Sequence, residues 1–384
     1  MIGRRQIQTF VSEYDLEKIK VGVLASHSAL DVADGAKDEQ LSTKLYCQRG
    51  REKTYTQYFK SRLREGNTVR GCVDEFEVFE RFNHMQKPAV SERMRKENVV
   101  FIPNRSFTSY LDIDVVEEYP VPYVGSRNLL RSEERGEQKD YYWMLEQAGL
   151  PYPEKIKDHK NIDDLCIVKL HHAEKKLERG FFTAATPREY QEKAQELIKQ
   201  GVITQNSLEE ARIERYIIGP VFNLDFFYNP LEEEYPRLEL LGVDWRFESS
   251  LDGHVRLTAP QQLSLKDTKQ EIPEMTVCGH NSATIRESLL DKAFELGEKY
   301  VKASQKYSDP GIIGAFCLQT CIDKDLNYYI YDVAPRIGGG TNVHLAVGHP
   351  YGNALWRRQM STGRRTAKLI KDAISQQRVE EIVT

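Results

Sequence analysis

The first 125 residues alternate short apolar runs with segments of helical spacing. Residues 20–25 form an apolar run that predicts a buried strand, and residues 29–37 have the spacing of an amphipathic helix. Two further strands are predicted at residues 43–47 and 98–102. Strand, polar turn and helix in this order predict a βαβ domain over residues 1–125.

Two polar residues follow strands of this predicted domain. His27 comes shortly after the first strand and Ser106 after the last. Ligands of βαβ domains lie beyond the carboxyl ends of the strands, so both residues are candidates for ligand binding. The alternative for His27 is a helix-capping segment without a ligand, because Ser26 or Ser28 can cap the next helix.

Residues 126–215 are predicted to form a separate α+β lobe. Residues 133–150 have the pattern of an amphipathic helix, and residues 165–170 form an apolar strand that contains Lys169. A lysine in a buried strand is costly unless its ammonium group meets an anion or reaches solvent. Lys169 is therefore expected either to bind an anion or to extend to the surface.

Residues 216–384 contain most of the remaining predicted strands. The expected elements are strands at 222–228 and 238–243, a helix at 288–302, a hairpin of 312–321 with 328–333, and a helical segment at 355–374. The hairpin places Gln319 and Asp332 on neighbouring strands. Residues 376–384 are expected to be a frayed tail.

The most informative stretch of the sequence is residues 329–342. An apolar run contains Asp332 and is followed by Arg336 and then by three consecutive glycines. Residues two apart in a strand share a face, so a carboxylate able to hold Mg²⁺ would lie beside a guanidinium able to hold phosphate. The glycines let backbone amides approach a ligand closely. The alternative is a buried ion pair followed by a flexible turn.

Charge and composition narrow the function classes. The chain has 54 basic and 58 acidic residues, and this net charge of −4 argues against a general electrostatic grip on nucleic acid or membrane. The sequence has neither an apolar run long enough for a membrane span nor a signal-peptide pattern. Its six cysteines lack metal-ligand spacing. A cytoplasmic protein with reduced cysteines is therefore expected.

The charged candidates together suit ATP chemistry, because phosphoryl transfer depends mainly on charge neutralisation and alignment. Lys169 and Arg336 would grip phosphate oxygens, and Asp332 with Gln319 would hold Mg²⁺, with Mn²⁺ as an alternative. The sequence contains no P-loop, no kinase motif set and no GxGxxG after the first strand. The class of ATP-binding protein that these exclusions leave is one in which two lobes close on ATP.

A series of short segments in a fixed order carries a resemblance to a known family. The segments are 26–28, 35–39, 48–52, 102–107, 121–123, 127–131, 213–219, 240–244, 285–290, 314–319 and 329–342. Together they resemble the ATP-grasp superfamily and, within it, the archaeal formate-dependent 5-formaminoimidazole-4-carboxamide ribonucleotide synthetases. The resemblance extends from about residue 14 to residue 370.

The resemblance implies an ATP-grasp fold behind an N-terminal βαβ domain, with a small lobe over residues 126–215 and a large lobe over residues 216–384. It implies that ATP phosphorylates formate, and that the amine of aminoimidazole carboxamide ribonucleotide attacks the formyl phosphate without folate. It also implies small-molecule substrates and a homo-oligomer. The implied roles are ribonucleotide binding by His27, Ser28, Ser106, Arg246, Glu248 and Asn342, ATP binding by Lys169, Glu214, Arg215 and Tyr216, metal binding by Gln319 and Asp332, and phosphate stabilisation by Arg336.

Three features depart from the family pattern. Residues 171–180 are charged where glycines are usual, so Lys175, Lys176 and Arg179 are expected to replace backbone amides as phosphate donors, in a segment that acts as a lid. Asp332 stands where glutamate is usual, and Asn104-Arg105 replaces His-Gly before the serine. Two alternatives therefore stay open: an ATP-grasp ligase for another acid or amine, and a non-catalytic nucleotide-binding paralogue.

Overall fold

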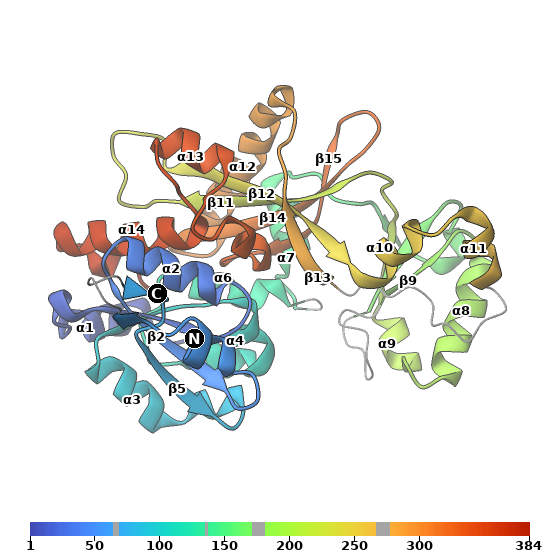
Figure 1. The fold of residues 1–384 in the computed structure, drawn as a ribbon. Helices are drawn as coiled ribbons and strands as arrows, with labels where there is room; N and C mark the ends of the chain where they lie inside the picture. The colour runs from blue at the N-terminus through green and yellow to red at the C-terminus, as the bar shows by residue number, and fades with distance from the viewer. Residues whose placement is uncertain (64–68, 135–136, 171–180, 266–276) are drawn as a thin grey trace.

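The computed structural model describes residues 1–63, 69–134, 137–170, 181–265 and 277–384. Figure 1 shows three bodies: an N-terminal domain, a central body built on a large sheet, and a smaller lobe at the far end. Both chain ends lie on the N-terminal domain. No helix in the described ranges is long and apolar enough to cross a lipid bilayer.

The N-terminal domain contains a four-stranded parallel sheet in the order β5-β2-β1-β6. The predicted βαβ arrangement is therefore confirmed. The strands are β1 (Lys20–Leu24), β2 (Ser42–Gln48), β5 (Glu75–Phe79) and β6 (Val99–Ile102), with a two-stranded ribbon of β3 (Arg62–Leu63) and β4 (Val69–Arg70). The helices are α1 (Arg4–Ser12), α2 (Ala29–Asp38), α3 (Pro88–Lys96), α4 (Arg105–Tyr110), α5 (Ile113–Glu118) and α6 (Arg127–Leu130).

The central body is built on a five-stranded antiparallel sheet in the order β13-β12-β11-β14-β15. The strands are β11 (Val221–Tyr228), β12 (Leu238–Glu248), β13 (Val277–Ser282), β14 (Gly314–Ile322) and β15 (Tyr328–Ala334). Leu224, Leu318 and Val333 belong to one buried cluster, which α7 (Tyr141–Ala148) and α12 (Leu290–Tyr307) complete. Because side chains alternate between faces, the polar residues of these strands lie on the opposite face.

Two predictions about this body are confirmed in outline, and one is wrong. The hairpin β14–β15 and the helix α12 are present. The helix predicted over residues 133–150 is much shorter, because Asp140 accepts a hydrogen bond from the Trp143 amide and starts α7 there. Gly149 ends α7 in the left-handed conformation, with a φ of 62°.

The small lobe is a four-stranded antiparallel sheet in the order β7-β10-β8-β9. Its strands are β7 (Lys155–Ile156), β8 (Cys166–Lys169), β9 (Phe181–Ala184) and β10 (Arg212–Arg215), covered by α8 (Pro187–Lys199) and α9 (Gln205–Glu209). Two short helices, α10 (Ser249–Val255) and α11 (Ala259–Ser264), follow β12 and lie beside this lobe (Figure 1). The small lobe has its own apolar cluster, so it packs as a unit.

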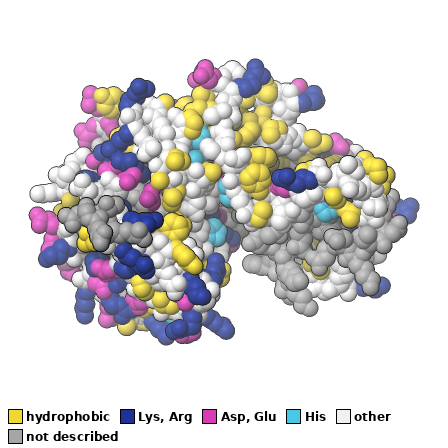
Figure 2. Space-filling view, viewed as in Figure 1, with side chains coloured by type: hydrophobic (Ala, Val, Ile, Leu, Met, Phe, Trp, Pro, Cys, Tyr) yellow, Lys and Arg dark blue, Asp and Glu magenta, His cyan; other side chains and the backbone are white. Residues whose placement is uncertain are grey.

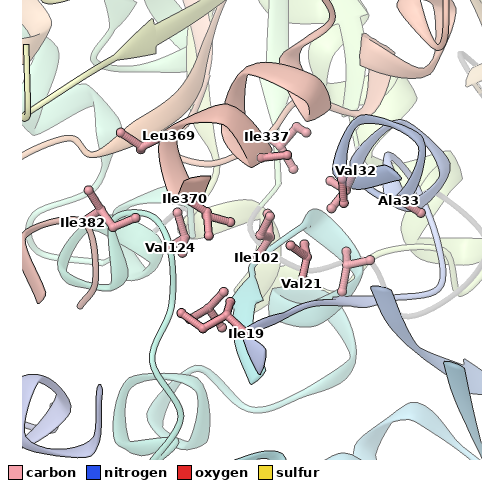
Figure 3. Packing of buried hydrophobic residues seen from close by; sticks show 14 of the residues in the cluster. Ile19, Val21, Val32, Ala33, Ile102, Val124, Ile337, Leu369, Ile370 and Ile382 are labelled. Carbon is pink, nitrogen blue, oxygen red and sulfur yellow. The ribbon is translucent and has the colours of Figure 1, made fainter. Parts of the chain in front are cut away.

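The C-terminal segment returns to the N-terminal domain. Helices α13 (Pro350–Trp356) and α14 (Thr362–Ser375) are followed by residues that pair with Tyr123 through both backbone hydrogen bonds of Thr384, at 3.1 and 3.0 Å. Figure 3 shows Ile382 and Ile370 packed with Ile19, Val21 and Ile102 in one core. The prediction of a frayed tail is therefore wrong, since this short apolar end completes the core of another domain.

Candidate active site

His27 and Ser106, predicted at the ends of two strands, meet in the structure. His27 Nδ1 lies 2.8 Å from Ser106 Oγ and 3.2 Å from Ser26 Oγ. The two residues follow β1 and β6, which are adjacent in the parallel sheet. His27 has a φ of 46°, an uncommon conformation for a non-glycine residue, and such strain is often found at functional sites.

The His27 imidazole is neutral at physiological pH. Although the ring is partly exposed, loss of hydration and the nearby Arg336 and Arg105 cations lower its pKa to about 4. The neutral ring can exchange hydrogen bonds with a ligand but is a weak proton acceptor. Figure 2 shows several histidine side chains gathered near the centre of the molecule, between the two larger bodies and the small lobe.

The glycine turn of residues 338–340 is packed between the N-terminal domain and the large sheet. The Ser28 hydroxyl donates to the Gly338 carbonyl. A Cβ atom on Gly339 would lie 3.3 Å from the His27 ring, and one on Gly340 would lie 2.2 Å from Asp244 Oδ1. The approach at Gly340 excludes any side chain and the one at Gly339 is tight, so the turn is a packing element rather than a flexible one.

Asn342 also joins the two bodies. Its Nδ2 donates to the His27 carbonyl at 2.6 Å, and its Oδ1 accepts from the Asp31 amide at 3.2 Å. The side chain is exposed where it makes these contacts. It therefore lies beside His27, as expected of a residue that contacts the same ligand.

Arg336 lies beyond the end of β15, so strand alternation does not set its direction. Its guanidinium forms a buried ion pair with Glu133, with Nη2 at 2.5 Å from Oε1. Arg105 lies 3.6 Å from the same carboxylate and 2.8 Å from Glu134. The sequence suggested Asp332 as the partner, and it gave no sign of Glu133, which is about 200 residues away.

Gln319 and Asp332 are direct register partners on β14 and β15, and each side chain is only 5% exposed. Gln319 Oε1 accepts a hydrogen bond from Arg246, which would have to move if this oxygen bound a metal. Within the described ranges, no group of three or more His, Cys, Asp and Glu residues could hold a metal ion. One carboxylate and one amide fit Mg²⁺, which keeps several ligands from water and substrate phosphates.

Lys169 is buried, so the alternative of a lysine that extends to solvent is wrong. Its Nζ lies 2.7 Å from Glu214 Oε2, 2.7 Å from the Tyr142 hydroxyl and 3.2 Å from the Tyr331 carbonyl. Glu214 is fully buried and also pairs with Arg212, at 2.5 Å. One carboxylate thus compensates two cations at the junction of the small lobe and the large sheet.

Arg215 and Tyr216 are not brought together with Lys169 by their side chains. The Arg215 guanidinium points to the surface, where it pairs with Glu154 and Asp163 at 3.4 and 3.2 Å. The amides of Arg215 and Tyr216 donate to the carbonyls of Glu154 and Leu165, both at 2.9 Å. This segment is thus anchored to its neighbours along both backbone edges.

The two residues that replace the His-Gly of the family pattern have different roles. Asn104 is completely buried, and its Nδ2 donates to the carbonyls of Leu24 and Ser26 at 2.9 and 3.0 Å. Asn104 therefore ties the ends of β1 and β6 together, while Arg105 faces the Glu133 carboxylate. The lid prediction, with Lys175, Lys176 and Arg179, falls outside the described residues.

Sequence reasoning missed a set of buried polar groups on the large sheet. Asp244 is inaccessible to solvent and accepts from Asn223 Nδ2 at 2.8 Å, while His280 Nδ1 lies 2.7 Å from the same oxygen. Burial and the adjacent Asp244 raise the pKa of Asp225 well above its ordinary value. The sequence does indicate a polar face on this sheet, because Asn223 and Asp225 alternate with apolar residues in β11.

Arg246 and Glu248 follow Asp244 on the same strand, two and four residues on, so they share its face of the sheet. Both side chains are half-buried. Burial raises the pKa of Glu248. The predicted position of both residues near one pocket is consistent with this arrangement.

Two family models match the chain. Residues 189–384 match a domain of unknown function (DUF1297), and residues 21–156 match a protein of unknown function (DUF1246). Among curated proteins, the 5-formaminoimidazole-4-carboxamide-1-(beta)-D-ribofuranosyl 5'-monophosphate synthetase of Methanopyrus kandleri is 38% identical, with full coverage of both chains. The protein of the same name from Methanothermobacter thermautotrophicus is 34% identical, over 100% of this chain and 99% of the relative.

Solved structures confirm the predicted fold. An IMP biosynthesis protein PurP from Thermococcus kodakaraensis is 28% identical and has a TM-score of 0.69, covering 95% of this chain and 100% of that one. An ADP complex of an N5-carboxyaminoimidazole ribonucleotide synthetase is 11% identical with a TM-score of 0.56, covering 90% and 78%. The fold is the ATP-grasp fold.

Proposed function

Because this chain belongs to the family of 5-formaminoimidazole-4-carboxamide-1-(beta)-D-ribofuranosyl 5'-monophosphate synthetases, we propose that it forms this ribonucleotide in IMP biosynthesis. Its substrates are ATP, formate and 5-aminoimidazole-4-carboxamide ribonucleotide. The observation that carries the proposal is the match to these synthetases along the whole chain. The site supports it, because the residues implied for ribonucleotide binding converge from two domains on the His27–Ser106 pair.

The chemistry requires activation of formate before the amine can attack. A carboxylate is a poor electrophile, and transfer of a phosphoryl group from ATP converts one of its oxygens into a leaving group. The resulting formyl phosphate hydrolyses readily, so the amine must be held close and water kept out. A site formed where three bodies meet suits both demands.

Two buried cations would counter the charge of the phosphates. Lys169 would bind ATP, and Arg336 would stabilise the transferred phosphoryl group. Each is held by a buried carboxylate, Glu214 and Glu133 respectively. These carboxylates fix the direction of the cations, and Lys169 would exchange one of its three contacts for a phosphate oxygen.

The ribonucleotide would lie against the ends of β1 and β6. His27, Ser106 and Asn342 offer neutral hydrogen-bonding groups there, and Ser28 holds the glycine turn in place. Gln319 and Asp332 would hold Mg²⁺, which supplies charge neutralisation to the phosphates when it is bound. The backbone near Glu214 and Tyr216 would hold the remainder of ATP. We also propose a cytoplasmic homo-oligomer.

The test is ADP release by the purified protein with ATP, Mg²⁺, formate and the ribonucleotide, each omitted in turn. ADP release that needs both formate and the ribonucleotide, with a formylated product by mass spectrometry, is the expected result. Release that is indifferent to formate would indicate a ligase for another acid. Binding of the ribonucleotide without any release would indicate a non-catalytic paralogue.

A further inference from the structure

His280 and Asp244 form a histidine–carboxylate pair on the polar face of the large sheet. His280 Nδ1 lies 2.7 Å from Asp244 Oδ1, and the Asp244 side chain is inaccessible to solvent. The His280 ring is half-buried, with 19% of its side chain exposed. In the part of the chain that the structure describes, Nε2 has no hydrogen-bond partner. The ring is therefore oriented by a buried acid and presents one nitrogen to a ligand.

The carboxylate of Asp244 is held rigidly. Asn223 Nδ2 donates to it at 2.8 Å, and the buried Asp225 side chain lies close enough to influence it electrostatically. Burial and the proximity of Asp244 raise the pKa of Asp225, which favours the protonated form of Asp225 beside Asp244. A buried carboxylate hydrogen-bonded to an imidazole orients the ring and stabilises the imidazolium ion that forms when the ring takes up a proton.

The pair lies next to the proposed ribonucleotide site. Gly339 packs against the His27 ring and Gly340 against the Asp244 carboxylate. These two adjacent glycines therefore lie between the His27 ring and the Asp244 carboxylate. His280 is the cross-strand partner of Arg246, which binds Gln319. The pair thus stands between the ribonucleotide-binding residues and the proposed metal ligands.

None of the ribonucleotide-binding residues around the ends of β1 and β6 suits the role of proton acceptor. The lowered pKa of His27, about 4, makes it a weak base, and its Nδ1 is already bonded to Ser106. Ser28 and Asn342 are occupied by the backbone of the other body. The amine nevertheless has to lose a proton when it becomes an amide.

We propose that His280 is a catalytic residue that accepts this proton at Nε2, and that Asp244 is its positioning residue. This inference rests on the proposed function. In the step, the amine nitrogen bonds to the formyl carbon, and Nε2 takes one N–H proton. The bond between that carbon and the phosphate oxygen then breaks, and phosphate leaves with the electron pair. One C–N bond replaces one C–O bond, and the proton passes from His280 to phosphate or water.

Several ionisable groups lie on the elements packed around His280. They are Asp244, Arg246 and Glu248 on β12, Asp225 on β11, Asp332 on β15 and His344 of the glycine-turn segment. Burial and the nearby His349 lower the pKa of His344 to about 4, so it stays neutral near physiological pH. Asp244 is the group in direct contact with the ring.

The experiment separates formyl phosphate formation from amine attack. Formate-dependent exchange of ¹⁸O between the bridging and non-bridging positions of ATP reports the first step, and single-turnover formation of the formylated ribonucleotide reports the second. For His280→Gln, we expect product formation to fall by about 10²-fold to 10⁴-fold, with isotope exchange changed less than about twofold. Asp244→Asn should give the same split, and imidazole added to His280→Ala should restore part of the rate.

Two controls make the result decisive. His159→Gln, a substitution in the small lobe, should leave both steps unchanged. Normal product formation by His280→Gln would overturn the inference while leaving the proposed function intact. Equal loss of both steps in His280→Gln, without imidazole rescue of His280→Ala, would also overturn it by assigning the residue a structural role. Absence of product from the unsubstituted protein would instead refute the proposed function.

Discussion

Asn342 Nδ2 donates a hydrogen bond of 2.6 Å to the backbone carbonyl of His27, and this contact joins two segments that are 315 residues apart. One segment ends a strand of the parallel sheet, and the other follows the glycine turn of the large sheet. The same Asn342 side chain accepts from the Asp31 amide. The left-handed backbone of His27 is thus held by a residue of another body.

Substitution of Asn342 by alanine should therefore disturb ribonucleotide binding more than folding. The side chain is exposed, so loss of its hydrogen bonds should lower the free energy of unfolding by only about 0.5–1.5 kcal/mol. The KM for the ribonucleotide should rise, while the KM for ATP stays within about twofold. Steady-state kinetics with Asn327→Ala as a control would check this, since Asn327 lies in the exposed β14–β15 turn. A larger effect on ATP than on the ribonucleotide would contradict the assignment.

Asp332→Ala should abolish turnover and leave ribonucleotide binding nearly intact. The carboxylate is one of two oxygen groups proposed to hold Mg²⁺, whereas His27, Ser106 and Asn342 of the ribonucleotide site gather at the ends of β1 and β6. Isothermal titration with the ribonucleotide and an ADP-release assay would measure the two properties separately. Asp332→Glu should retain part of the activity, because glutamate offers the same carboxylate ligand, one methylene further from the backbone. Unchanged turnover in the alanine variant would remove Asp332 from the metal site.

Lys169→Ala should raise the KM for ATP at least tenfold and also destabilise the small lobe. The buried Glu214 would keep only Arg212 as a partner, and uncompensated buried charge costs about 3–5 kcal/mol when no partner remains. The loss should be smaller here because one cation stays. The variant Lys169→Met, which keeps the Arg212–Glu214 pair and fills the space with an apolar side chain, should be more stable than Lys169→Ala in urea denaturation but should not recover ATP affinity. A normal KM in Lys169→Ala would exclude this residue from the ATP site.

Local patterns in the sequence predicted the elements well, because alternation and strand–turn–helix order depend on near neighbours. The parallel sheet, the hairpin β14–β15 and the positions of His27 and Ser106 after strands followed from such patterns, whereas the contact between these two side chains was not predicted. Pairs between distant segments could not be predicted in this way. Glu133 as the partner of Arg336 is one example, and Thr384 completing the N-terminal core is another. Each depends on how whole bodies pack together.

The candidate site residues also differ in whether the sequence could predict them. Lys169 and Asp332 were found because each is a charge in an apolar strand, which requires a physical reason. The Asp244–His280 pair was missed because its two members lie on different strands, 36 residues apart, and neither forms a motif alone. Alternating polar residues on β11 indicated a polar sheet face, but the sequence did not specify which residues would meet on it.

The final prediction concerns the pH dependence of folding at Asp31. This residue is fully buried on α2, and desolvation raises its pKa from 3.8 to about 6, against the lowering effect of hydrogen bonds from Ser361 and the Gly363 amide. Between these two pH values the folded state binds more protons at Asp31 than the unfolded state. Its contribution to stability therefore falls as the pH rises from about 4 to about 6, and stays constant above.

Asp31→Asn removes this titration. As the pH rises over that range, the free energy of unfolding of the variant should increase by roughly 3 kcal/mol relative to that of the unsubstituted protein, since each pKa unit corresponds to about 1.4 kcal/mol. The variant is therefore relatively more stable at the higher pH. Urea denaturation at pH 4, 5, 6, 7 and 8 would measure the difference. A difference that does not change with pH would show that Asp31 titrates alike in both states, and that the α2–α14 contact tolerates its charge.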